Sequence, residues 1–138
     1  MNKLIELGSV IDGSEPFLIA EKFLNFNNSL VYIARDDREI FNLKNKLKWL
    51  LPNIEILVYR SWDQIPYDNV SPSKEIQSER IKTLYKIGSS CKKIIITSVN
   101  AIIQKTINND FLKKNCIEIY QNQNLNFNEF ILTLTSLG

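Results

Sequence analysis

Three short apolar runs, separated by amphipathic segments, restrict this chain to one class of fold. Each run is nearly continuous in apolar character, as is typical of a strand covered on both faces, and strands are therefore expected at 29–34, 54–59 and 93–97. Around these runs apolar residues recur at helical spacing, which predicts helices at 16–25, 37–51, 73–87 and 99–107. Strands that alternate with such helices form βαβ units. We therefore predict an α/β fold, a three-layer sandwich built around a parallel sheet.

The final part of the chain has a different pattern. A strand is expected at Cys116–Tyr120, followed by a polar stretch and an amphipathic helix over residues 127–137. We therefore divide the chain into an α/β domain, residues 1–115, and the beginning of a second small domain, residues 116–138. Glycine commonly follows the end of a helix, and we expect Gly138 to mark an imposed boundary rather than the natural end of the protein.

Composition excludes several classes of function. None of the 138 residues is a histidine, so the most common general base and metal ligand near neutral pH is missing. The two cysteines, Cys91 and Cys116, are too few for a zinc site. A disulfide between them is possible in principle, but two buried thiols are the favoured interpretation. With 17 basic and 15 acidic residues, no basic stripe is evident. A secretion signal and a run of about 20 apolar residues are both lacking, so we expect a cytoplasmic protein.

The segment before the first helix shows whether this fold could hold a nucleotide. A phosphate-binding loop needs glycine N–H groups that face the phosphate and a lysine followed by serine or threonine. Here Gly13 and Ser14 are followed by Glu15 and Pro16. Pro16 has no amide N–H and Glu15 would repel a phosphate. These residues instead suit a helix start, with Ser14 as the cap and Glu15 in the first turn, and we predict no cofactor site here.

Two further strand ends carry polar side chains that could have chemical roles. Asp36 and Asp37 follow the first strand, and paired carboxylates can hold Mg²⁺ for phosphate chemistry. They also suit the cap and first turn of the next helix, and this interpretation is favoured because no third ligand is identifiable. Ser98, after the third strand, could contact a DNA backbone, but a helix cap is the simpler role. We therefore predict no metal site and no catalytic residue.

The loop at 61–72 is the most distinctive segment of the chain. It contains WDQIPYD, in which Trp62 and Tyr67 could stack on nucleobases or anchor a protein partner. Packing of the same rings over the edge of the sheet is the favoured alternative. We include Arg80, in the following helix, in this possible partner or nucleic-acid surface. A nucleic-acid-binding module that uses Trp62–Tyr67 is therefore the alternative function.

Taken together, these segments resemble one family. ARDDRE, WDQIPYD, SPSKEIQSERIKTLY and TSVNAIIQK occur in this order in the amino-terminal, UvrB-like module of bacterial transcription-repair coupling factor (Mfd). The resemblance covers residues 14–138. More distantly, the pattern is similar to the first domain of the excision-repair helicase UvrB. In an alignment through Phe17–Ala20, the phosphate-binding lysine and threonine of that helicase fall on Glu15 and Pro16.

The resemblance implies a degenerate helicase fold that acts as a scaffold or interaction domain, without ATPase activity of its own. It implies a longer protein, an ATP-dependent DNA translocase that displaces stalled RNA polymerase and recruits UvrA in nucleotide excision repair. ATP and Mg²⁺ would be bound by the downstream motor of that protein. UvrA would be bound through the second domain, mostly after Gly138, so no UvrA contact is assigned here. The interval 61–72 is also too short for the long hairpin with which UvrB probes DNA.

Overall fold

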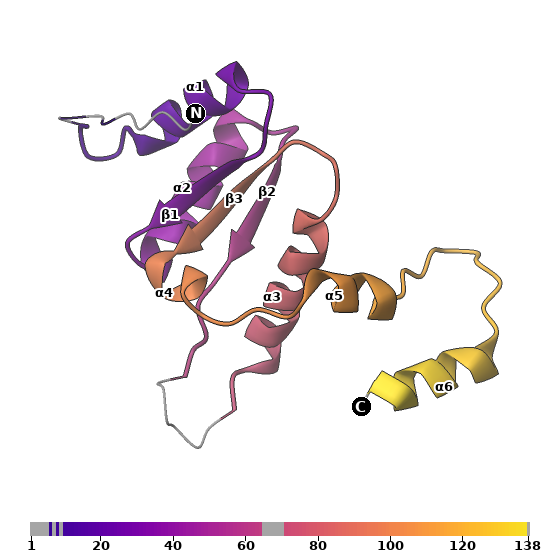
Figure 1. Ribbon diagram of the computed structural model, residues 1–138. Coiled ribbons are helices and arrows are strands. Elements are labelled where there is room, and N and C mark those ends of the chain that lie inside the picture. The colour runs from indigo at the N-terminus through magenta and orange to yellow at the C-terminus, as the bar shows by residue number, and fades with distance from the viewer. Residues whose placement is uncertain (1–5, 7, 9, 65–70, 138) are drawn as a thin grey trace. The chain divides into compact units, whose positions relative to one another are not determined.

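A parallel β-sheet organises the first part of the chain in the computed structural model, which describes residues 6, 8, 10–64 and 71–137 (Figure 1). Its strands are β1 (Leu30–Ala34), β2 (Glu55–Tyr59) and β3 (Lys93–Ser98). They lie in the order β1-β3-β2, so β3 is central among the described strands and is buried along its whole length. In the register, Ile96 of β3 lies between Tyr32 of β1 and Val58 of β2.

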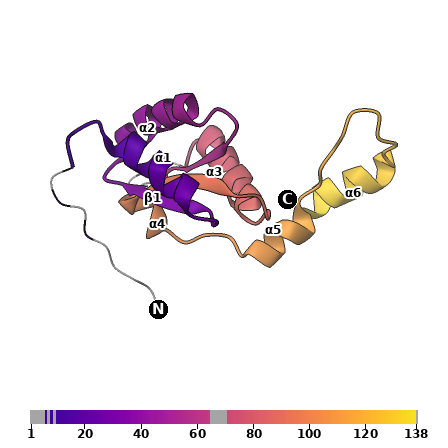
Figure 2. The ribbon, with the colours of Figure 1, turned by 90° about the horizontal axis from the view of Figure 1, so that it is seen from above.

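Helices cover both faces of this sheet, which confirms the predicted α/β sandwich. On one face lie α1 (Glu15–Asn25) and α2 (Asp37–Leu50), which pack side by side (Figure 2). On the other face α3 (Lys74–Ile87) packs against β2, and the short α4 (Val99–Ile102) follows β3 directly. Most predicted bounds agree with these within one or two residues. The exception is α4, which was expected to continue to residue 107.

The main core lies between α1, α2 and the sheet. Side chains spaced at helical intervals on both helices meet alternate residues of β3, and the most completely buried of them are Phe23, Ile40, Leu47, Ile94 and Ile96. Burying one such side chain contributes about 1.5–3 kcal/mol. This layer therefore fixes where α1 and α2 begin relative to the strand ends.

Residues 106–138 form a separate compact unit, with α5 (Asn109–Asn115) and α6 (Phe127–Leu137). The strand predicted at Cys116–Tyr120 is wrong. Cys116 ends α5 by donating its N–H to the Leu112 carbonyl (2.9 Å), and no described strand lies beside the residues that follow. An apolar alternation without a partner strand does not make a sheet. The domain boundary predicted between residues 115 and 116 stays a prediction.

The expectation of two buried thiols is also wrong in part. Cys116 is half-buried, but Cys91 is exposed, because it lies in the turn between α3 and β3, where the chain runs over the surface. Within the described part of the chain, none of the helices has the length and apolar character that crossing a bilayer requires.

Candidate functional site

The carboxyl ends of the strands lie at one edge of the sheet, which is where parallel α/β folds place their ligands. At this edge the chain leaves β1 at Arg35, β2 at Arg60 and β3 at Ser98, and the candidate polar residues lie in or beside these three connections. The hydrogen bonds that these residues make decide whether the edge has groups free for chemistry.

Asp36 and Asp37 make separate structural hydrogen bonds. Asp36 Oδ1 accepts the backbone N–H groups of Glu39 (3.0 Å) and Arg38 (2.9 Å), which confirms the predicted helix cap. The bond from Glu39 is the main reason that the pKa of Asp36 lies below its usual value. Asp37 Oδ2 accepts from the hydroxyl (2.7 Å) and N–H (3.3 Å) of Ser61, while its Oδ1 is buried without a partner among the described residues.

Metal-ligand geometry is not seen at this pair. Across the described ranges, no three His, Cys, Asp or Glu side chains gather closely enough to hold a metal ion. The two carboxylates are directed to different elements, one to its own helix and the other to the loop after β2. Their arrangement accounts for the position of α2 relative to that loop.

The hydroxyls after β3 are also engaged. Ser98 is 1% exposed and its Oγ accepts the N–H of Ala101 (3.3 Å), which confirms the predicted cap of α4. Thr97 is buried and donates its hydroxyl to the Tyr59 carbonyl of β2 (2.9 Å). Neither hydroxyl faces solvent, so neither is placed to contact a DNA backbone.

A buried arginine organises the end of β2. Arg80 of α3 is 2% exposed, and its guanidinium carbon lies 4.2 Å from the Tyr59 ring centroid and 4.1 Å from that of Trp62. Its Nη1 donates to Gln104 Oε1 (3.0 Å) and to the Arg60 carbonyl, and its Nη2 donates to the Tyr59 hydroxyl. We call these five residues, Tyr59, Arg60, Trp62, Arg80 and Gln104, the Arg80 cluster.

Electrostatics in the Arg80 cluster favour a closed structural arrangement. Burial is the main reason that the pKa of Arg80 lies below its usual value, and the adjacent Tyr59 hydroxyl opposes that effect. Burial likewise raises the pKa of Tyr59. Two aromatic faces and three acceptors compensate the desolvated guanidinium. The Arg80 guanidinium therefore stabilises the fold from inside and is not exposed at the surface.

The loop after β2 is held at both of its described ends. Gln104 Oε1 also accepts the Trp62 N–H (3.2 Å), and Asp63 accepts the Ser73 N–H (3.1 Å) at the start of α3. Tyr67 lies outside the described residues. The structure thus brings together Trp62 and Arg80, two of the three residues proposed as a partner or nucleic-acid surface. That role stays a prediction, and one face of the Trp62 ring is already occupied by Arg80.

Gln104 is the member of this cluster that sequence reasoning missed. It was expected inside a helix over 99–107, but Gln104 instead donates its N–H to the Ala101 carbonyl (3.3 Å) in a tight turn after α4. This turn directs its side chain to the loop of a different strand. A single glutamine carries no periodic or charge signal by which this could have been found.

The segment Gly13–Pro16 lies in the turn that leads into α1. Gly13 has a φ of 87°, a conformation that glycine adopts at no steric cost. The predicted side-chain cap by Ser14 is wrong, because its hydroxyl donates to the Ile11 carbonyl (2.6 Å). Ser14 has helical backbone angles, which direct its side chain away from the first N–H groups of the helix. Glu15 and Pro16 occupy the first turn, as expected.

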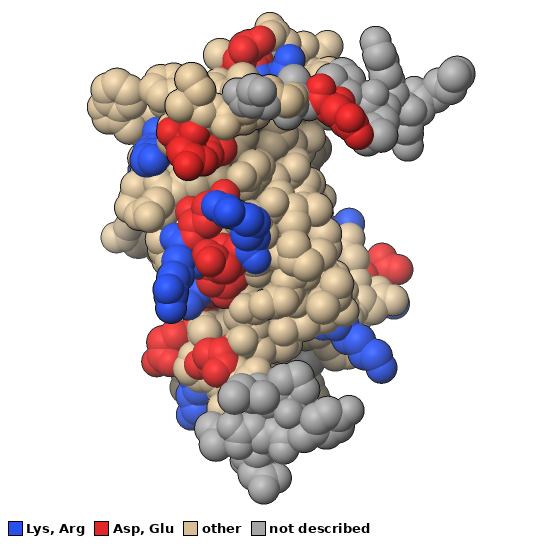
Figure 3. All heavy atoms as spheres, turned by 90° about the vertical axis from the view of Figure 1, so that its left-hand side faces the viewer, with Lys and Arg blue, Asp and Glu red and all other residues tan. Residues whose placement is uncertain are grey.

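The residues of this turn are poorly suited to bind a phosphate group. Pro16 offers no N–H, Glu15 adds a negative charge, and the Ser14 hydroxyl proton is already donated to a carbonyl. Basic and acidic side chains also lie next to one another on the molecular face that includes β1 and α1, without a continuous basic stripe (Figure 3). An anion therefore meets no concentrated positive charge on this face.

Tyr32 gives a pH-dependent test of the β1 end. Its hydroxyl donates to Glu39 Oε1 (2.8 Å), and its pKa is raised from 10.0 to about 12, by burial first and by that hydrogen bond second. Because folding favours the protonated form, this stabilisation is complete below pH 10.0 and is lost as the pH rises toward about 12. Ultraviolet titration should detect one more ionising tyrosine in the unaltered chain than in Tyr32→Phe, and the difference between the two curves should have its midpoint near pH 12. A difference curve centred near the usual tyrosine pKa would contradict the hydrogen bond.

Comparison with known proteins gives a single name. The chain is 26% identical over 96% of its length to the transcription-repair-coupling factor of Haemophilus influenzae, and 25% identical over 96% to that of Escherichia coli. It is 28% identical over 84% of its length to the transcription-repair-coupling factor of Rickettsia bellii. The chain spans only 10–11% of the length of these relatives. No family model matches it.

Proposed function

We propose that this chain, which belongs to the transcription-repair-coupling factor family, serves there as a non-catalytic scaffold and interaction domain. The observation that carries the proposal is the start of α1, where Glu15 and Pro16 stand in the first turn and Ser14 donates to a backbone carbonyl. A triphosphate needs a cation and several free N–H groups at this place. These residues supply neither.

The strand-end edge supports the same proposal. The polar groups that a catalytic crevice would keep available are used here to join one connection to the next. Asp37 binds Ser61, Arg80 lies between two aromatic rings, and Ser98 caps α4. These contacts occupy the polar groups at the strand ends. The domain would then keep the helicase-like fold as a rigid body that other parts of the protein can contact.

In the longer family member, ATP hydrolysis would take place in other domains. That protein would be an ATP-dependent DNA translocase that displaces stalled RNA polymerase and recruits UvrA for excision repair. ATP and Mg²⁺ would be bound by its own motor domains, and UvrA through segments other than the α/β domain described here. The name shared by the relatives supports the coupling of transcription to repair.

Addition of Mg-ATP is expected to leave the melting temperature of this chain unchanged. A ligand at about 100 times its dissociation constant adds about 2.7 kcal/mol to the stability of the folded state, which a thermal melt detects readily. The measurement is a melt at increasing Mg-ATP concentration, with an active phosphate-loop ATPase as the positive control. A saturable rise in melting temperature for this chain would overturn the non-catalytic assignment at α1.

A further inference from the structure

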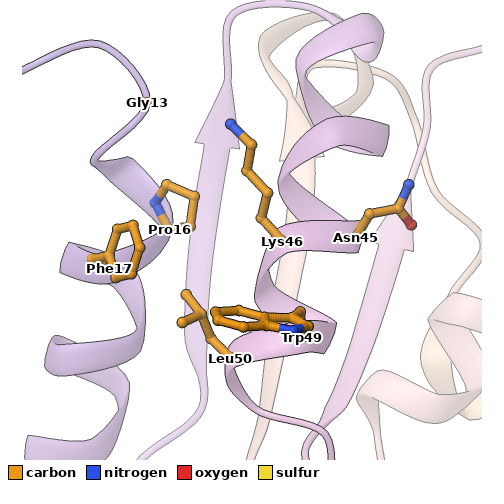
Figure 4. Close-up of a pocket in the computed structure, with 7 residues that line it drawn as sticks. All are labelled: Gly13, Pro16, Phe17, Asn45, Lys46, Trp49 and Leu50. Carbon is orange, nitrogen blue, oxygen red and sulfur yellow. The ribbon is translucent and has the colours of Figure 1, made fainter.

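The helix α1 borders one groove toward α2 and another toward β1. The lining of the first includes Pro16 and Phe17 of α1 and Trp49 of α2 (Figure 4). The second groove has a volume of about 460 Å³ and is lined by other residues of the same helix and by the strand, including Glu15, Leu18, Lys22, Leu30, Val31 and Tyr32. We call Glu15, Leu18 and Lys22, which lie at helical spacing on the β1 side of α1, the α1 stripe.

The second groove lies along the free edge of β1. Successive side chains of a strand point to opposite faces of the sheet, so Leu30, Val31 and Tyr32 can line one groove only where it reaches the edge of the strand. Among the described strands β1 pairs with β3 alone. The backbone N–H and C=O groups on its other side therefore have no strand partner in the described part of the chain. Such an edge is a template for a further strand.

The residues of β1 do not protect this edge. Outer strands commonly carry a charged residue or a proline that prevents edge-to-edge pairing. Of the described strands, β2 is the outer one on the other side of β3, and it begins with Glu55, which pairs with Lys86 (2.7 Å). The sequence of β1, LVYIA, contains neither kind of residue. Val31 and Ile33 are also 54% and 49% exposed. The β1 edge is thus suited to pair with another apolar strand.

We propose that two copies of this chain pair through the β1 edge. Their β1 strands would lie antiparallel about a two-fold axis and join the two sheets into one. Because α1 runs along β1 in the opposite direction in both views (Figures 1 and 2), the two α1 helices would also meet antiparallel, on one face of the joined sheet. The two-fold axis then places Glu15 opposite the partner's Lys22, with Leu18 against its own counterpart.

The charges of the α1 stripe favour a second copy over other occupants. An interface between identical copies needs a surface that is complementary to itself. A stripe with an acid at one end and a base at the other meets this condition in the antiparallel arrangement, which is also how two-fold-related β1 strands pair within one sheet. An acidic or a basic peptide would be attracted at one end of the groove and repelled at the other. A nucleic-acid strand would meet Glu15 and the uncharged β1.

The first test is the oligomeric state of the full chain, measured by sedimentation equilibrium without nucleotide. We expect a dimer. Val31→Lys should weaken this dimer about 30-fold, because it places a charge on the pairing strand of each copy. Ile81→Lys is the matched control, since it introduces the same charge at an exposed apolar position of α3 and should leave the dissociation constant unchanged. Circular dichroism of each variant verifies that the fold is retained.

Charge reversal tests the arrangement of the two copies. Glu15→Lys and Lys22→Glu should each weaken the dimer about tenfold, because each puts like charges together at both ends of the paired stripes. The double variant should regain the dissociation constant of the unaltered chain, since it restores opposite charges at both contacts. Rescue of this kind is expected only if the two residues face each other across the two-fold axis.

Several outcomes would overturn the proposal. They are a chain that stays monomeric, a dimer that Val31→Lys leaves intact, or a double variant no tighter than the single reversals. A monomer in which the β1 amides exchange slowly would mean that the chain covers this edge itself. A monomer that captures the separately produced remainder of the Haemophilus influenzae relative through β1 would assign the edge to contacts within the longer protein. The pairing goes beyond the proposed function and does not rest on it, because nucleotide binding at α1 is measured separately.

Discussion

Replacing Arg80 by leucine is expected to lower the free energy of unfolding by about 3 kcal/mol. The substitution keeps an apolar stem against Tyr59 and Trp62 but removes every donor that the guanidinium supplies. The Arg60 carbonyl would lose its Arg80 donor in a place that water reaches poorly, while Gln104 Oε1 would keep only the Trp62 N–H. An acceptor left in this state costs about 1–3 kcal/mol. The loss of the cation between two rings adds to that cost.

Urea denaturation followed by circular dichroism measures this loss. Lys82→Leu is the matched control, because Lys82 is an exposed cation on the same helix and should change stability by no more than about 0.5 kcal/mol. Arg80→Lys should lie between the two, since an ammonium group keeps the charge but loses the planar fork. A cost below about 1 kcal/mol for Arg80→Leu would mean that the cluster is not a structural unit.

The Arg80 cluster also explains why the strand-end edge resembles a ligand site without presenting free groups. Arginine, tryptophan and tyrosine are the residues expected at a binding surface, and Trp62 and Arg80 are two of the three residues predicted for one from the sequence. In the folded chain the Arg80 guanidinium contacts the Trp62 ring, because α3 places Arg80 against the loop that carries Trp62. Residue type alone could not distinguish an exposed site from an internal one.

The parts of the fold that the sequence predicted are those determined by local periodicity. The run at 93–97 is a buried central strand, and the helix at 37–51 carries Ile40, Leu43 and Leu47 on its buried face. The failures lie where the outcome depends on distant partners. Cys116–Tyr120 has strand-like residues but no described neighbouring strand, and α4 stops early where the Gln104 side chain bonds to the loop after β2.

The same distinction applies to the candidate site. The caps at Asp36 and Ser98 were predictable, because each bonds to N–H groups within three residues. The bond between Asp37 and Ser61, and that between Arg80 and Gln104, join residues separated by 24 positions. Nothing in the local sequence indicates such pairs. Ser14 shows that even a local cap can fail when the backbone angles are already helical.

Phe23→Ala is expected to have the largest effect of the substitutions considered, a loss of about 4 kcal/mol. Phe23 is 1% exposed and lies in the core between α1, α2 and the sheet. The Lys92 ammonium group lies 4.2 Å from its ring centroid and donates to the Phe23 carbonyl (2.6 Å). Truncation would leave a cavity in the core and would remove the ring that this cation contacts.

Phe26→Ala is the matched control for this prediction. Phe26 follows α1 as its C-cap and is 55% exposed, so its truncation should cost no more than about 0.5 kcal/mol. Small domains have a total stability of about 5–15 kcal/mol, so Phe23→Ala should remove a large share of it while Phe26→Ala leaves the urea midpoint nearly unchanged. Equal midpoints for the two variants would contradict the placement of α1.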